Sequence, residues 1–290
     1  MTRTLFIAAA LAATVCAAQD LRLPNKKDSF RFAVLGDTGT GSKQQYQVAD
    51  QVTLYRQVFP FNTVILLGDN LYGGEKPRDY EVKFERPYAT LLRDGVKFFA
   101  TLGNHDDPGQ RNYKHFNMNG RRYYTFQPKN GIRFFALDSN YMERQQIEWL
   151  EKELSGSASD WKIAFFHHPL YSSGEKHGPD DDLRRVLEPL LLKYGVSVVF
   201  AGHEHFYERL KPQKGILHFV AGGSAKLRKG NIRKSAQTAL GFDTDNTFML
   251  CEIDGDRLYY QTVTRTGRTI DSGVFMRTQP MLQSSRAVID

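Results

Sequence analysis

The 290-residue chain contains only two cysteines, Cys16 and Cys251. Cys16 lies in a segment that we expect to be removed, which would leave Cys251 alone and exclude an intrachain disulfide in the mature chain. Stability must then come from the packing of a core. Cysteine is also absent from the metal-ligand motifs described below, which argues against a structural zinc site of the thiolate type.

Long hydrophobic runs are also scarce, apart from one near the N-terminus. Arg3 precedes an apolar stretch from Leu5 to Val15, and the small residues around Cys16 resemble a cleavage site. This pattern predicts a signal peptide over residues 1–19, too short for a stable membrane span. We therefore expect a secreted or periplasmic protein with no membrane span after signal removal. A retained anchor is the alternative interpretation.

The chain has no helix-turn-helix, zinc-finger or aromatic RNA-binding signature. Its net charge is nevertheless +7, with a pI of about 9.3. Such a charge can steer anionic substrates into a site or bind nucleic acid, and no specific nucleic-acid motif favours the latter. A basic cluster is predicted on an exposed loop, where it is either solvated or in contact with substrate: Lys226, Arg228, Lys229, Arg233 and Lys234.

No internal repeat or low-complexity tract divides the chain. We predict one catalytic domain over residues 28–277 and a flexible tail over 278–290, because the motifs below run through most of the chain. Helices are predicted over residues 43–59, 80–92, 143–154 and 181–194. The order is β-α-β-α-β followed by a more antiparallel half, in which residues 254–256 form a hairpin turn between strands 248–253 and 258–264.

Five apolar, β-prone runs each end in residues that can bind a metal. The runs are 32–35, 64–67, 98–102, 163–166 and 196–201, and the motifs that follow them are Gly36-Asp37, Gly68-Asp69-Asn70-Leu71-Tyr72, Gly103-Asn104-His105-Asp106, His167-His168-Pro169 and Gly202-His203-Glu204-His205. Ligands bind at the carboxyl ends of strands in open α/β sheets. Five such motifs predict one site that holds more than one metal ion.

The residue types match the chemistry of such a site. An aspartate can bridge two cations, and histidine nitrogens suit iron and zinc while carboxylate and amide oxygens also suit manganese. Each motif alone has an ordinary explanation, since Gly-Asp is a common turn and Asn104-His105 could cap a helix. Five coincidences at five strand ends are much less probable than a shared site.

The ordered motifs resemble those of the calcineurin-like metallophosphoesterases, and within them the purple acid phosphatases of the small, tartrate-resistant type. Tyr72 carries the subfamily likeness, because purple acid phosphatases have a tyrosine three positions after the bridging aspartate. The resemblance extends over about residues 30–265 and includes the segments 123–126, 146–150 and 206–209.

The resemblance implies two metal ions. Asp37, Tyr72 and His205 would hold Fe(III), and Asp69 would bridge the two ions. The second ion would be Fe(II), Zn or Mn, and its remaining ligands would be Asn104, His167 and His203.

Two further histidines receive catalytic roles from the resemblance. His105 would contact substrate phosphate and help to protonate the departing alkoxide, and His177, by a looser match in a loop, would be a second substrate histidine. His168 has no ligand role in the pattern and would stand behind a ligand or face phosphate. Asp106 either orients His105 or is a simple turn residue.

The implied fold is α/β, a four-layer α/β/β/α sandwich of two mixed β-sheets with a binuclear metal site at the carboxyl edge of the strands. The implied function is hydrolysis of phosphate monoesters by in-line attack of a metal-bound hydroxide, with small phosphorylated substrates and a monomeric enzyme. A phosphodiesterase or nucleotide hydrolase with the same metals is the alternative, and a non-catalytic phosphate-binding protein is the contrasting class.

Overall fold

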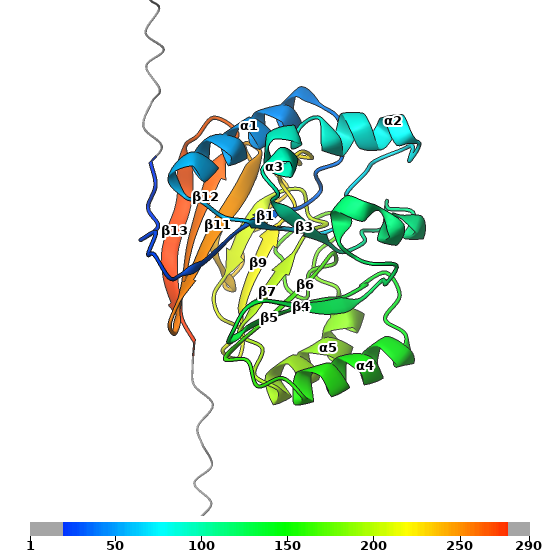
Figure 1. Cartoon of the computed structure of the whole chain (residues 1–290). Helices are drawn as coiled ribbons and strands as arrows, with labels where there is room; N and C mark the ends of the chain where they lie inside the picture. The colour runs from blue at the N-terminus through cyan, green and yellow to red at the C-terminus, as the bar shows by residue number, and fades with distance from the viewer. Residues whose placement is uncertain (1–19, 278–290) are drawn as a thin grey trace, which may run out of the picture.

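The computed structural model describes residues 20–277, which form two β-sheets packed face to face with helices outside (Figure 1). The first sheet has the strand order β13-β12-β11-β1-β2-β3. Its members are β1 (Phe30–Leu35), β2 (Thr63–Leu66), β3 (Lys97–Ala100), β11 (Thr247–Asp254), β12 (Arg257–Thr264) and β13 (Thr269–Met276). The β1, β2 and β3 strands run parallel, whereas β11, β12 and β13 pair antiparallel.

The second sheet has the order β10-β8-β9-β7-β6-β5-β4 and is also mixed. Its strands are β4 (Tyr124–Lys129), β5 (Ile132–Ala136), β6 (Trp161–Phe166), β7 (Val198–Ala201), β8 (Tyr207–Leu210), β9 (Leu217–Ala221) and β10 (Thr238–Phe242). The central β5, β6, β7 and β9 strands are parallel, and antiparallel strands flank them. Parallel strands buried on both faces read as continuous apolar runs, as the sequence does here.

Helices cover the outer face of each sheet (Figure 1). The α1 (Lys43–Val58) and α3 (Ala89–Arg93) helices lie on the first sheet, and α4 (Arg144–Ser155) and α5 (Asp181–Lys193) lie on the second. The predicted four-layer α/β/β/α sandwich is therefore confirmed. Among residues 20–277, none of the helices is both long and apolar enough to cross a membrane.

Three of the four predicted helices form as α1, α4 and α5, and polar caps explain where two of them begin. The side chains of Ser42 and Asp180 accept hydrogen bonds from the first turns of α1 and α5. The continuous helix predicted over residues 80–92 is wrong. The segment forms α2 (Pro77–Tyr80), a π-helical turn (Glu81–Glu85) and the separate α3, because Pro87 has no N–H and cannot continue the helix.

Aromatic side chains fill the space between the two sheets. The ring of Phe32 on β1 lies 5.3 Å from that of Phe134 on β5 and 6.0 Å from that of Phe200 on β7. A second cluster, which includes Leu150 and Leu187, lies between the second sheet and its helices. Because both sheets are held rigidly, the loops that leave their strand ends have fixed starting points.

The predicted signal peptide (residues 1–19) and tail (residues 278–290) lie outside the described residues. Within the described part, the 254–256 turn joins the antiparallel β11 and β12, as predicted.

Candidate metal centre

The five motifs meet at one edge of the sandwich, where backbone hydrogen bonds tie their loops together. The Asp37 N–H donates to the Gly68 carbonyl, joining the first two motifs, and the Gly202 N–H donates to the His167 carbonyl, joining the last two. The two sheets are linked by His167 Nδ1, which lies 2.9 Å from the carbonyl oxygen of Leu67. The third motif is tied to the second by Asp106, whose carboxylate accepts the backbone N–H groups of Asn70 and Leu71, so all seven predicted metal ligands lie in connected loops.

The first group of donor atoms comes from Asp37, Asp69, Tyr72 and His205. The Tyr72 hydroxyl donates to Asp37 Oδ1 across 3.0 Å and lies 3.2 Å from His205 Nε2. His205 Nε2 lies 3.4 Å from the same Asp37 oxygen. One ligand atom each from Asp37, Asp69 and His205 lie within 4.8 Å of one another, a spacing that suits a bound cation.

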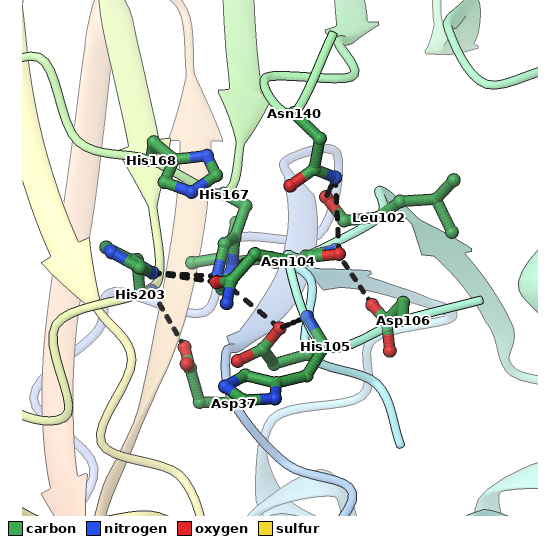
Figure 2. Close-up of polar contacts among 12 residues, drawn as sticks. Asp37, Leu102, Asn104, His105, Asp106, Asn140, His167, His168 and His203 are labelled. Atoms are coloured by element: carbon green, nitrogen blue, oxygen red, sulfur yellow. Dashed lines mark hydrogen bonds and ion pairs between the residues drawn. The ribbon is translucent and has the colours of Figure 1, made fainter. Parts of the chain in front are cut away.

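The second group of donor atoms comes from Asn104, His167 and His203 (Figure 2). Asn104 Oδ1 lies 3.0 Å from both His167 Nε2 and His203 Nδ1, and the two imidazole nitrogens are 3.1 Å apart. His167 Nε2 also lies 3.5 Å from Asp69 Oδ1. Asp69 therefore borders both groups, as a bridging carboxylate must.

Burial removes the proton from the imidazoles of this centre and favours one on the Asp37 carboxyl. Desolvation lowers the pKa of the His203 imidazole to about 2 and that of His205 to about 4, so both rings are neutral at ordinary pH. Desolvation, with Asp69 close by, raises the pKa of Asp37 well above its usual range. Neutral imidazoles beside buried carboxylates are a donor set that fits metal ions of the iron, zinc or manganese type.

The backbone at this edge is held in conformations that few residues adopt. Asp37, Asp69 and His203 have φ values of 55°, 50° and 68°, all in the left-handed region. Such strain persists only where surrounding structure fixes it, and it gathers at functional sites. At Gly202 a Cβ atom would lie 2.7 Å from Asp37 Oδ2, and at Gly103 it would collide with Asp69. The glycines of these motifs therefore leave room for the carboxylates.

The two predicted catalytic histidines stand on different sides of the centre. The His105 backbone N–H donates to Asp69 Oδ1 across 3.0 Å, and its exposed ring lies 5.0 Å from that of Tyr72. The exposed ring of His177 lies 4.4 Å from that of His203. The structure thus brings His105 beside the first group and His177 beside the second.

His168 is closer to the centre than the sequence indicates. Its ring centroid lies 4.5 Å from that of His203, and His167, His168 and His203 each offer a nitrogen within 4.8 Å of the others (Figure 2). Ser139 Oγ accepts the His168 backbone N–H and lies 2.9 Å from His168 Nδ1. The doubled histidine after β6 was the signal in the sequence, but it could not show the direction of the ring.

Asp106 does not orient His105. Its carboxylate accepts hydrogen bonds from the backbone N–H groups of Asn70, Leu71 and Gly103 and from the side-chain amides of Asn70 and Gln110. No hydrogen bond joins it to the His105 imidazole within residues 20–277. Asp106 instead fixes the second and third motif loops to each other, a larger role than that of a simple turn residue.

Comparisons with a family model and with individual proteins agree on one family. The calcineurin-like phosphoesterase family model matches residues 30–207. The human tartrate-resistant acid phosphatase type 5 is 25% identical over 87% of this chain and 94% of its own length. The purple acid phosphatase 17 of Arabidopsis thaliana is 25% identical over 72% of this chain and 72% of its own length.

Solved structures show the same fold. A purple acid phosphatase from yellow lupin seeds superposes with a TM-score of 0.70 at 19% identity, covering 88% of this chain and 55% of the lupin chain. The inner-membrane-complex anchor GAP50 of Plasmodium superposes with a TM-score of 0.75 at 21% identity, covering 87% of this chain and 90% of its own. The resemblance to purple acid phosphatases is confirmed, and with its family match the chain belongs to the calcineurin-like phosphoesterases, hydrolases of phosphoric esters.

Proposed function

We propose that the chain is a secreted binuclear metallophosphatase that hydrolyses phosphate monoesters. The observation that carries the proposal is the position of Asp69, which borders one donor group through Asp37 and His205 and the other through His167. A single carboxylate between two such groups is the arrangement that two neighbouring ions require.

The ligands divide between two ions according to the two donor groups. Asp37, Tyr72 and His205 would hold Fe(III) with Asp69 shared, because the phenol, carboxylate and imidazole donors lie within 3.0–3.4 Å of one another. The second ion would be Fe(II), Zn or Mn, with Asn104, His167 and His203 as its other ligands. Ions held there would neutralise phosphate oxygens and activate water near neutral pH.

The histidines around the centre would position the substrate and move a proton. His105 lies in the exposed loop directly after Asn104, where its ring can reach a phosphate ester and protonate the departing oxygen. His177 approaches from the side of His203 and would hold a phosphate oxygen.

His168 would add a further hydrogen-bond donor. Ser139 Oγ already accepts the His168 backbone N–H, and in this proposal its hydroxyl would donate to His168 Nδ1, 2.9 Å away. The imidazole proton would then be on Nε2, where it could be donated to phosphate.

A turnover assay with quantified metals tests the proposal. We expect metal-loaded protein to release phosphate from an aryl phosphate faster than an aryl group from a bis-aryl phosphate. The reverse preference would make the chain a phosphodiesterase. No turnover of either substrate with two ions bound would make it a non-catalytic phosphate-binding protein. His115→Ala is a suitable control for the histidine variants, because His115 packs away from the centre against Phe84 and Tyr113.

Export and oligomeric state are part of the same proposal. The segment of residues 1–19 would direct the chain out of the cytoplasm and be cleaved. Determination of the N-terminus of exported protein checks this, since an intact Met1 would mean a retained anchor. Light scattering of the purified protein checks the expected monomer.

A further inference from the structure

A cleft lies beside the metal centre, and the proposed reaction does not use it. It has a volume of about 450 Å³ and is bordered by the loop before α1, the segment from Ala225 to Lys229, and residues near Arg265. Three of its lining side chains are cationic: Lys226, Lys229 and Arg265. The cleft therefore has the size and the charge for an anionic group.

Lys226 connects this cleft to the metal centre. Its Nζ lies 4.4 Å from the centroid of the Tyr72 ring, and its backbone N–H donates to the carbonyl of Asp37. The Arg228 N–H donates to the carbonyl of His205 across 2.9 Å. Because these hydrogen bonds tie the loop to the backbone of two proposed ligands, the backbone of the loop has a defined place beside the metal centre.

The cleft has an excess of positive charge. Arg265 is neutralised by Asp245 at 2.5 Å and also donates to Gln47. Among residues 20–277, no carboxylate forms an ion pair with Lys226 or Lys229. By contrast, Arg233 on the same stretch of chain pairs with Glu175. Two lysines left without carboxylates beside an anion-binding centre favour a second anion.

We propose that this cleft is a subsite for a second phosphate group, so that the preferred substrates are small bisphosphorylated compounds. This inference rests on the proposed phosphatase function, because the scissile phosphate must lie at the metal centre. Lys226 would contact the distal phosphate where the cleft meets the centre, and Lys229, an exposed residue that also lines the cleft, would contact it too. Ammonium–phosphate pairs of this kind are charge-assisted and position the ligand.

Calorimetric binding to metal-loaded protein tests the subsite separately from catalysis. The probes are pentylphosphonate and pentane-1,5-diyl bisphosphonate, whose P–C bonds a phosphatase does not hydrolyse, and the measured quantity is the ratio of their affinities. Because the second probe carries two equivalent groups, statistics alone favour it about twofold, and we expect the wild type to prefer it by more than that. Lys229→Met should reduce the ratio by about two- to fivefold, as expected for one exposed charge pair, and Lys226→Met with Lys229→Met should remove the preference.

Lys234→Met is the matched control, because Lys234 is an exposed lysine of the same basic cluster outside the cleft, and it should leave the ratio unchanged. An equal ratio in the wild type and the double variant would overturn the subsite. Failure of pentylphosphonate to bind would instead contradict the phosphatase function. Failure of both probes would overturn both proposals.

Discussion

The hydroxyl of Tyr72 donates a hydrogen bond to Oδ1 of Asp37, and the two oxygens are 3.0 Å apart. Both atoms would face the same ion in a loaded site, so the phenol proton occupies the direction that a metal would take. Desolvation and the carboxylates of Asp37 and Asp69 raise the pKa of Tyr72 above its ordinary value. The metal-free centre therefore keeps this proton through neutral pH, and a ferric ion must displace it.

Tyr72→Phe should remove colour without removing most of the activity. A phenolate bound to Fe(III) gives a charge-transfer band in the visible spectrum, whereas phenylalanine offers no such donor. Three proposed ligands of that ion remain, and the tyrosine is not the nucleophile. The absorption spectrum and iron content of both proteins check this. An iron-loaded wild type with no visible band would mean that Tyr72 does not bind iron.

Metal binding should release a proton, and its affinity should rise with pH. His203 and His205 are neutral above pH values of about 2 and 4, so they have no proton to lose at pH 7. Tyr72, whose pKa is raised, does have one, and the bound form requires phenolate. The raised pKa of Asp37 acts in the same direction, because the bound form requires carboxylate. For each proton released, affinity should increase about tenfold per pH unit.

Titration calorimetry in buffers of different ionisation enthalpy counts these protons. We expect the wild type to release about one more proton than Tyr72→Phe when Fe(III) binds. Equal proton counts in the two proteins would show that the Tyr72 phenol stays protonated beside the metal.

The sequence predicts the position of the centre well because its ligands follow strands. Parallel strands end at one edge, so Asp37, Asp69 and Asn104 are brought together by sheet order alone. The roles of His168 and Asp106 could not be predicted in this way. They depend on contacts with Ser139 and Asn70, which lie 29 and 36 residues away and enter through loop geometry.

The interruption of the helix predicted over residues 80–92 is different, because Pro87 in the sequence already marks a position that a helix cannot continue through. The position of the Lys226 ammonium group above the Tyr72 ring also depends on tertiary structure. Nothing in the basic run from Lys226 to Lys234 distinguishes the lysine that contacts the centre from those that face solvent.

Asp69→Ala should reduce the number of bound metal ions per chain more than Asp37→Ala does. The Asp69 carboxylate lies near donor atoms of both groups, whereas the donor side chains near Asp37 belong to the first group and its contact with the second is to the backbone N–H of His203. We expect Asp37→Ala to retain about one ion per chain and Asp69→Ala to retain clearly less than one. Elemental analysis after desalting without chelators measures this. Retention of a full ion by Asp69→Ala would mean that its carboxylate does not bridge.

His105→Ala should keep both ions but change how strongly the rate depends on the leaving group of the substrate. General-acid assistance is typically worth about 10²–10⁴-fold and matters most when the departing oxygen is basic. We therefore expect a far larger loss in kcat/KM for an alkyl phosphate than for an aryl phosphate, whose phenolate leaves unaided. His177→Ala should show a milder form, and the control His115→Ala should show none. Equal losses on both substrates would assign His105 to phosphate binding alone.

Asp106→Asn should destabilise the fold around the centre and leave the leaving-group preference intact. Five N–H donors point at this carboxylate, and an asparagine would set its own NH₂ group against some of them. Buried donors left unpaired cost roughly 1–3 kcal/mol, so the free energy of unfolding of the metal-free protein should fall by about that amount. Asp107→Asn is the control, since asparagine caps the following turn as well as aspartate does. Denaturant titration measures the free energy of unfolding. The ratio of alkyl to aryl phosphate turnover reports whether His105 still assists the departure of the leaving group. A ratio that falls as far as in His105→Ala would restore the interpretation that Asp106 orients this histidine.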